Sequence, residues 1–229
     1  MEREHSLENP AWVRLRFAQT GDDMARTAIG LRNVLAWVTA ICGWASLGIQ
    51  LAIMLEAMAI GPALWRFLGF FTILTNLLVA VMATRIALGR QTGLSGPVAR
   101  MGITAAILLV GIAYWFLLAP FWTPTGWQLV ADIGLHTVQP VLAAALWLAM
   151  RDGSLGWSDV PKAAIWPAAY AVYALARGAG DGWYAYWFLN PKDQSLVELL
   201  ISIAGLSLLV TGIGAVLVAI DRAPRARRA

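Results

Sequence analysis

Long apolar segments separated by short polar loops dominate this 229-residue chain. A helix that crosses a bilayer needs about 20 mostly apolar residues. Six segments meet or approach that length, at residues 29–59, 67–88, 101–119, 127–150, 162–177 and 196–220. The pattern predicts an all-α, polytopic integral membrane protein. Its six-helix transmembrane bundle covers residues 29–221, between a polar tail at 1–28 and a basic tail at 222–229.

The fifth segment is the weakest of the six. It is short and contains Pro167, which interrupts helical hydrogen bonding. By hydropathy alone, a five-helix arrangement stays open. The first segment is long enough to tilt within the bilayer or to extend beyond it.

The distribution of basic residues favours an even number of spans. Of the 17 lysines and arginines, 13 lie in the two tails and the second and fourth loops, three lie in the alternating loops, and Arg32 lies just inside the first helix. Positive charge marks the cytoplasmic side of a membrane protein. We therefore expect both termini in the cytoplasm. Trp65, Trp122, Trp127, Trp183 and Trp187 lie in or beside the opposite loops, where tryptophan favours the headgroup level.

Composition excludes several classes of function. Only 13% of residues are charged, against about a quarter in soluble domains. The basic excess lies in loops between apolar runs, so we expect no nucleic-acid partner. Cys42 is the single cysteine and no Cys/His spacing suits a metal. We expect no metal, no cofactor and no cleaved signal peptide, and the sequence leaves the oligomeric state open.

Polar side chains inside a membrane are costly, so they are candidates for function. Eight fall within or beside the predicted helices: Glu56, Thr72, Thr75, Asn76, Asp132, His136, Gln139 and Glu198. Counted from the outer ends of their helices at about 1.5 Å per residue, Thr72 and His136 lie roughly 9 Å and 14 Å deep. This pattern predicts one polar cavity that opens outward or into the outer leaflet.

His136 is the only histidine within a predicted span. Asp132 lies one turn earlier on the same face, where a carboxylate can orient the imidazole. Pro140 lies one turn later, so the helix should kink and leave the carbonyl of His136 free. A structural histidine that bonds across helices is an equally good interpretation of these features.

A base needs a nucleophile, and a threonine hydroxyl can serve when a base lies beside it. Thr72 lies at matching depth, Thr75 is the fallback, and Asn76 could donate to an oxyanion. The alternative is that each threonine bonds back to the carbonyl four residues earlier.

Three blocks in this order resemble a known family. They are FTILTN at 71–76, LHTVQP at 135–140 and GWYAYWFLNP at 182–191. The chain resembles, over about residues 30–220, the androgen-induced gene and FAR-type family of six-helix membrane proteins, and most of all its bacterial Pr-six-Pr branch. Membership implies a multi-pass protein of the bacterial cytoplasmic membrane.

The resemblance also implies an activity, because animal members are threonine hydrolases of fatty acid esters of hydroxy fatty acids. It implies Thr72 and His136 as the catalytic pair and a lipid or fatty-acyl ester as the substrate. Asp132, Asn76 and Thr75 would support them. The expected substrate-binding residues are Arg177, Tyr184, Tyr186, Trp187 and Glu198. A non-enzymatic lipid-binding or transport protein remains the alternative, and a haem or quinone protein is a third.

Overall fold

The computed structural model describes residues 11–224, with the side chains of Thr27 and of residues 29–224. All regular elements of that part are helical. They are α1 (Ala11–Ala57), α2 (Ile60–Phe67), α3 (Phe71–Ala87), α4 (Pro97–Ala113), α5 (Gly126–Ile133), α6 (Gln139–Met150), α7 (Ile165–Asp181) and α8 (Leu196–Arg222). Residues 1–10 and 225–229, the ends of the two predicted tails, lie outside the described part.

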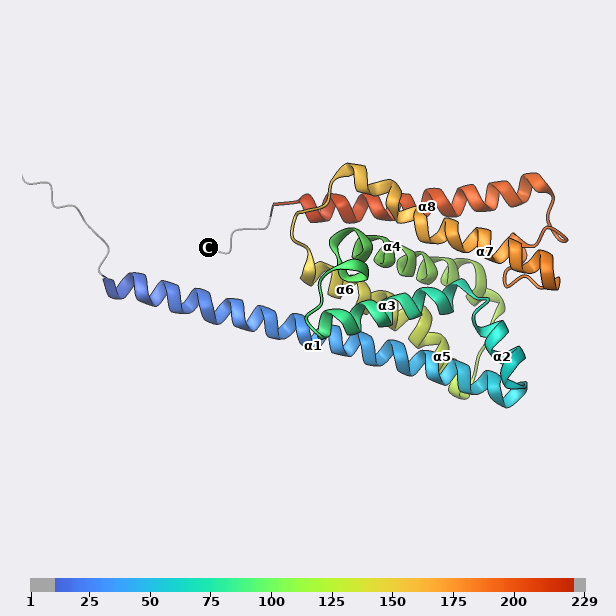
Figure 1. The fold of residues 1–229 in the computed structure, drawn as a ribbon, viewed down its shortest axis with the longest axis horizontal. Helices are drawn as coiled ribbons and strands as arrows, with labels where there is room; N and C mark the ends of the chain where they lie inside the picture. The colour runs from blue at the N-terminus through green and yellow to red at the C-terminus, as the bar shows by residue number, and fades with distance from the viewer. Residues whose placement is uncertain (1–10, 225–229) are drawn as a thin grey trace, which may run out of the picture.

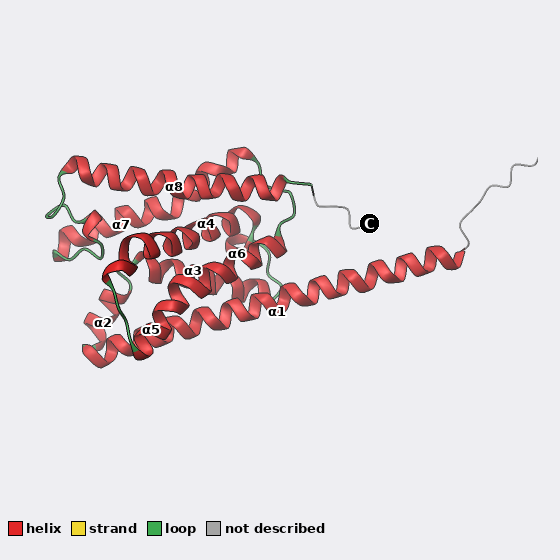
Figure 2. Ribbon diagram, turned by 180° about the vertical axis from the view of Figure 1, so that it is seen from behind, coloured by secondary structure: helices red, strands yellow, loops and turns green. Residues whose placement is uncertain are grey.

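The helices form a bundle in which α4 is central (Figure 1). Helix α4 contacts α3, α6 and α8, while α1 lies along α3, α5 and α6. Helices α7 and α8 form the other side of the bundle, seen from behind in Figure 2. A 3₁₀ segment, Trp157–Ala164, leads into α7 and packs on α8. The N-terminal part of α1 extends beyond the other helices.

Within the described residues, four helical stretches are long and apolar enough to cross a membrane: Ile29–Ala57, Pro97–Phe121, Gly126–Met150 and Leu196–Arg222. The pair α2 and α3 makes a fifth if the two count as one span. Helix α7 has 17 residues and is not among them. The prediction of an all-helical membrane protein is thus confirmed in its main features, and the fifth predicted segment is again the weakest.

Large apolar side chains cover the outside of the bundle. Phe121 is 88% exposed, Leu208 74% and Val172 70%. Such a surface would be unstable in water but suits contact with lipid chains. The exposed tryptophans Trp65 and Trp187 lie at the end formed by α2 and the loop between α7 and α8, as an interfacial belt would.

The largest difference from the predicted helices is the break between α2 and α3, which meet at 82°. The sequence pattern predicted one continuous span from residue 67. The helix α1 also begins at Ala11, well inside the predicted polar tail. Its apolar part ends at Ala57, close to the predicted boundary.

The break is stabilised by donors from α7. Tyr170 donates to the carbonyl of Gly69 at 2.9 Å, and Tyr173 to that of Leu68 at 3.1 Å. The guanidinium of Arg177 donates to the carbonyl of Trp65. These are carbonyls that a helix end leaves without partners. Because α7 supplies the donors, α3 can begin abruptly at Phe71.

Away from the break between α2 and α3, apolar side chains pack in the interior of the bundle. Met82 of α3, Ile107 of α4 and Leu146 of α6 are fully buried in one cluster. Met101 and Val218 belong to a second cluster between α4 and α8. A cavity lies at the end where α3 begins.

Candidate functional site

A cavity of about 670 Å³ opens at the end of the bundle where α1 ends and α3 begins. Its walls come from α1, α2, α3, α5, the last turns of the α4 span and the loop between α7 and α8. Thr72, Asp132 and His136 all line it. The structure therefore brings together the main residues singled out in the sequence, in the one cavity that their depths predicted.

His136 is held by Asp132, four residues earlier. Its Nδ1 lies 3.0 Å from the backbone oxygen of Asp132 and 3.4 Å from the carboxylate Oδ1. Both oxygens accept hydrogen bonds, so in the neutral imidazole the proton sits on Nδ1 and Nε2 is free to act as a base. The two side chains are 13% and 7% exposed, which keeps this pair largely away from bulk water.

Tyr114 completes the group from another helix. Its hydroxyl donates to Oδ2 of Asp132, and its ring stacks on His136 with centroids 4.0 Å apart and planes 17° apart. The carboxylate of Asp132 thus bridges Tyr114 and His136. The hydroxyl of Tyr114 fixes the carboxylate, and its ring fixes the plane of the imidazole.

Both members of this stack lie in π-helical turns. Tyr114 begins the π-segment Tyr114–Leu118, and His136 is central in the π-segment Gly134–Val138. Each segment ends shortly before a proline, Pro120 or Pro140, whose missing N–H disturbs the helical ladder. The irregular backbone predicted near His136 is present, as a π-segment. Such segments are frequent at functional sites.

Gly111 lets these two segments approach closely. A Cβ at this position would lie 3.2 Å from the backbone oxygen of His136 and 3.3 Å from Cγ of Pro140. Glycine therefore permits a contact that any larger residue would push apart. The carbonyl left free by Pro140 faces α4 at this contact.

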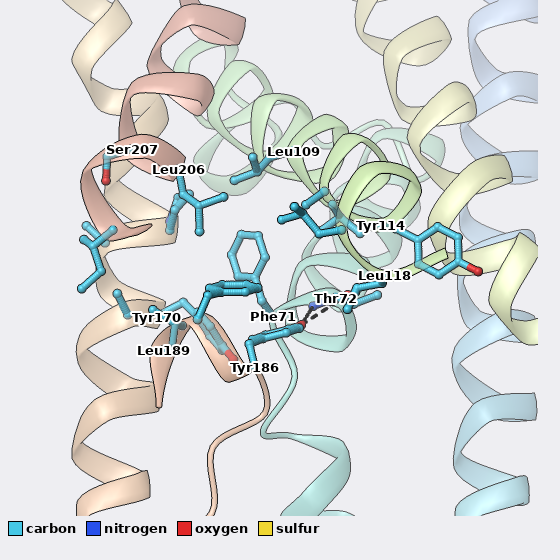
Figure 3. A pocket seen from close by; sticks show the side chains of 18 residues that line it. Phe71, Thr72, Leu109, Tyr114, Leu118, Tyr170, Tyr186, Leu189, Leu206 and Ser207 are labelled. Carbon is cyan, nitrogen blue, oxygen red and sulfur yellow. Dashed lines mark hydrogen bonds between the residues drawn. The ribbon is translucent and has the colours of Figure 1, made fainter. Parts of the chain in front are cut away.

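Thr72 lies in the first turn of α3. Its N–H has no partner within its own helix and instead donates to the hydroxyl of Tyr186 at 3.4 Å. Its Oγ1 lies 3.5 Å from the same hydroxyl. Figure 3 shows Thr72 beside Tyr186, with the hydroxyl of Tyr114 turned away from both. A helix N-terminus favours negative charge, so the N–H groups of Thr72 and Ile73 are suited to an oxyanion.

Tyr186 belongs to the aromatic loop singled out in the sequence. It stacks on Phe188 with ring centroids 5.2 Å apart. Burial raises the pKa of the Tyr186 phenol above its usual range, and the hydrogen bonds from Thr72 oppose this only in part. The phenol is therefore neutral and can donate to Thr72 Oγ1 or accept from it.

Asn76 connects the start of α3 to the π-segment that contains His136. Its Nδ2 donates to the carbonyl of Thr72 at 2.8 Å and to that of Leu135 at 3.3 Å. Because Leu135 precedes His136, this fully buried amide fixes the start of α3 against the π-segment. Its donors are used in this contact, so the structure places Asn76 in a positioning role and not as the predicted oxyanion donor.

Thr75 faces a different part of the protein. Its Oγ1 accepts a hydrogen bond from Nε1 of Trp166 on α7 at 3.0 Å, and the residue is fully buried. It does not line the cavity. Of the two candidate nucleophiles, Thr72 is the one that the fold brings to the cavity of His136.

Most of the predicted substrate-binding residues have structural partners. Arg177 stacks on Trp65 with its guanidinium carbon 3.9 Å from the ring centroid, and its Nε lies 3.6 Å from Asp181. Tyr184 packs so closely on Gly178 that a Cβ there would lie 2.2 Å from its ring. The carboxylate of Glu198 caps the start of α8 by accepting from Ser195. Trp187 does line the cavity.

Four further polar residues of the cavity were not among the candidates from the sequence: Gln50, Arg66, Tyr114 and Gln128. The side chain of Gln128 donates to that of Gln50 at 2.9 Å across the cavity wall. Two of them could have been found in the sequence. Tyr114 is a hydroxyl-bearing residue within an apolar span, and Gln128 is an amide four residues before Asp132. Arg66 lies at the end of α2, and its position depends on the break that the sequence did not predict.

Among residues 27–224, no three His, Cys, Asp or Glu side chains form a group that could hold a metal ion. Comparisons of the chain with protein-family models, with curated proteins and with solved structures gave no match. The resemblance noted in the sequence therefore stays a prediction. The geometry of the cavity is the basis for the function proposed next.

Proposed function

We propose that this protein is an intramembrane hydrolase of lipid esters, with Thr72 as the nucleophile and His136 as the base. The observation that carries the proposal is the group Asp132–His136–Tyr114 in a cavity that also contains Thr72. A carboxylate that holds Nδ1 of a histidine leaves Nε2 to take a proton, as in hydrolytic triads.

In the proposed reaction, Thr72 Oγ1 attacks the ester carbonyl carbon while its proton moves to His136 Nε2. The N–H groups at the start of α3 stabilise the oxyanion. The tetrahedral intermediate expels the alcohol, which takes the proton from His136, and leaves an acyl group on Thr72. Water then attacks this acyl-threonine, His136 takes the proton of the water, and Thr72 recovers it as the fatty acid leaves.

The surroundings of the cavity support a hydrolase more than a transporter. The cavity lies at one end of the bundle, and the apolar side chains of Met82, Ile107 and Leu146 fill the interior between α3, α4 and α6. A transporter needs a path that can open to both sides. An ester hydrolase needs only one opening, toward lipid or the outer surface.

One observation favours the second candidate, a non-enzymatic lipid-binding protein. The hydroxyl of Thr72 contacts Tyr186, at 3.5 Å, and among the described residues no hydrogen bond joins it to His136. For hydrolysis, the substrate must draw Thr72 toward His136, as catalytic hydrogen bonds often tighten only in the complex. For binding alone, no such change is needed.

We further propose that the chain crosses the bacterial cytoplasmic membrane six times with both termini in the cytoplasm. The bent pair α2–α3 would be the second span, and residues 157–181, the 3₁₀ segment with α7, would form the fifth. The charge distribution supports this orientation, and it places the cavity on the outer side.

The test compares wild type with Thr72→Ala, Thr75→Val and His136→Ala in detergent. Each protein is assayed for labelling by a fluorophosphonate probe and for hydrolysis of a fatty acid ester of a hydroxy fatty acid. We expect Thr72→Ala and His136→Ala to lower both signals at least about a hundredfold. Thr75→Val, a matched loss of a hydroxyl outside the cavity, should retain them. Full activity in Thr72→Ala would exclude the proposed nucleophile, and an inactive wild type would support the binding protein.

A further inference from the structure

The cavity has a positive charge that the protein itself does not neutralise. Arg66 lines it at the end of α2. Its guanidinium lies over the ring of Trp183, 5.2 Å from the centroid. Within the part of the chain that the structure describes, the side chain of Arg66 has no hydrogen bond or ion pair. An exposed guanidinium held against an aromatic face keeps its donors available for a ligand.

Two acidic groups near Arg66 are already engaged. Asp132, the acidic residue of the cavity wall, uses one carboxylate oxygen for Tyr114 and faces Nδ1 of His136 with the other. Asp181 accepts from Nε1 of Trp65 at 2.6 Å and lies beside Arg177. The charge of Arg66 is therefore free to attract an anionic group from outside the protein.

Arg177 makes the contrast clear. Two of its nitrogens donate to Trp65 and Tyr173, its third lies beside Asp181, and it is 8% exposed. The resemblance in the sequence implied that Arg177 is one of the substrate-binding residues. The structure uses that side chain to hold the break between α2 and α3, and presents Arg66 to the cavity instead.

A second, apolar pocket of about 80 Å³ adjoins the cavity. Thr72, Tyr114 and Tyr186 line both spaces. Beyond them the pocket runs between α4, α7 and α8, past Ala171, Leu189 and Leu206 (Figure 3). A water-sized group needs roughly 10–15 Å³ of such space, so the pocket has room for about six groups of that size.

We propose that Arg66 anchors the carboxylate of a long-chain lipid whose apolar chain passes Thr72 into this pocket. The bidentate fit of guanidinium to carboxylate favours this head group. This proposal rests on the proposed function in one respect: the ester bond that reacts lies between the carboxylate and the end of the chain, beside Thr72. Arg66 is thus a positioning residue that selects substrates with a free carboxylate.

Equilibrium binding tests the anchor without any catalysis. The probe is cis-parinaric acid, whose fluorescence rises in an apolar site, with its methyl ester as the uncharged partner. Both are titrated in detergent at about pH 8, where a carboxylic acid is ionised. The proteins are wild type, Arg66→Gln, and Arg90→Gln as the matched control, since Arg90 is also exposed but lies in the loop after α3.

We expect Arg66→Gln to weaken binding of the acid about tenfold or more, as loss of a charge-assisted hydrogen bond does, and to leave the methyl ester unchanged. Arg90→Gln should bind both ligands as wild type does. Equal binding of the acid by wild type and Arg66→Gln would overturn the proposal. Equal losses for acid and ester would overturn it too, because they would show a structural effect.

One more variant tests the placement of the chain. Ala171→Leu fills the apolar pocket, so binding of the long-chain acid should weaken several-fold, and unchanged binding would refute the placement of the chain. Ester hydrolysis is measured on the same proteins, which separates this proposal from the hydrolase. If neither wild type nor any variant hydrolyses esters but binding of the acid still depends on Arg66, the proposed role of Arg66 is supported and the proposed hydrolase is refuted.

Discussion

The ring of Tyr114 lies flat on the imidazole of His136, with centroids 4.0 Å apart, while its hydroxyl reaches the carboxylate that holds that imidazole. One side chain thus controls both the plane of the base and the position of its partner. Tyr114 comes from the α4 span and His136 from the next, so this contact also joins two spans at the cavity.

Tyr114→Phe should slow ester hydrolysis while barely changing substrate affinity. The ring stays and stacks on His136, but Asp132 loses a hydrogen bond worth about 1.5–3 kcal/mol. We expect kcat to fall about tenfold with KM within about twofold. Steady-state kinetics on the ester substrate measures both. Tyr173→Phe, which removes a hydroxyl outside the cavity, is the control and should keep kcat.

Wild-type kinetics in Tyr114→Phe would show that Asp132 does not need this partner.

Gly111→Ala should weaken both stability and activity. The added Cβ would lie 3.2 Å from the backbone oxygen of His136, so α4 and the π-segment Gly134–Val138 must move apart by a few tenths of an ångström. Overpacking of this kind costs about 1–3 kcal/mol. Thermal unfolding in detergent, followed by tryptophan fluorescence, reports the stability. Gly205→Ala is the matched control, because a Cβ there meets nothing within 4 Å.

For Gly205→Ala we expect no loss of stability, since alanine is the better helix former. If both alanine variants unfold at the same temperature as wild type, the contact at Gly111 has more tolerance than its geometry indicates.

Tyr170→Phe should destabilise the protein more than Tyr173→Phe does. Both hydroxyls donate to carbonyls of the break between α2 and α3, but Tyr170 is 4% exposed and Tyr173 is 38% exposed. A buried carbonyl left without a donor costs about 1–3 kcal/mol, whereas an exposed one finds another partner. Unfolding midpoints of the two variants measure the difference. Equal midpoints would mean that the break does not depend on its buried donor.

The two ends of α7 should be accessible from opposite sides of the membrane. Single cysteines are placed in a Cys42→Ala background by Ser154→Cys before α7 and Asp193→Cys after it, both at exposed loop positions. A membrane-impermeant maleimide should label Asp193→Cys in intact cells and Ser154→Cys only after permeabilisation. Labelling of both from one side would show that α7 does not span the membrane and would reduce the count to five.

Much of this protein followed from local sequence. Apolar runs of about 20 residues can only be spanning helices or buried ones, so the boundaries near Ala57, Met150 and Leu196 could be read directly. The pairing of Asp132 with His136 followed from helical periodicity, because residues four apart share a face.

Only the tertiary structure determined the contacts between segments that are distant in the sequence. The break before Phe71 depends on donors that α7 supplies from about 100 residues further along the chain, at Tyr170 and Arg177. The choice of Thr72 over Thr75 depends on which helix each one faces. Tyr114 joins His136 only because Gly111 allows α4 and the π-segment to touch. Hydropathy and periodicity describe one segment of the chain at a time. These contacts join segments that are far apart in the sequence, so only the packing of the folded bundle determines them.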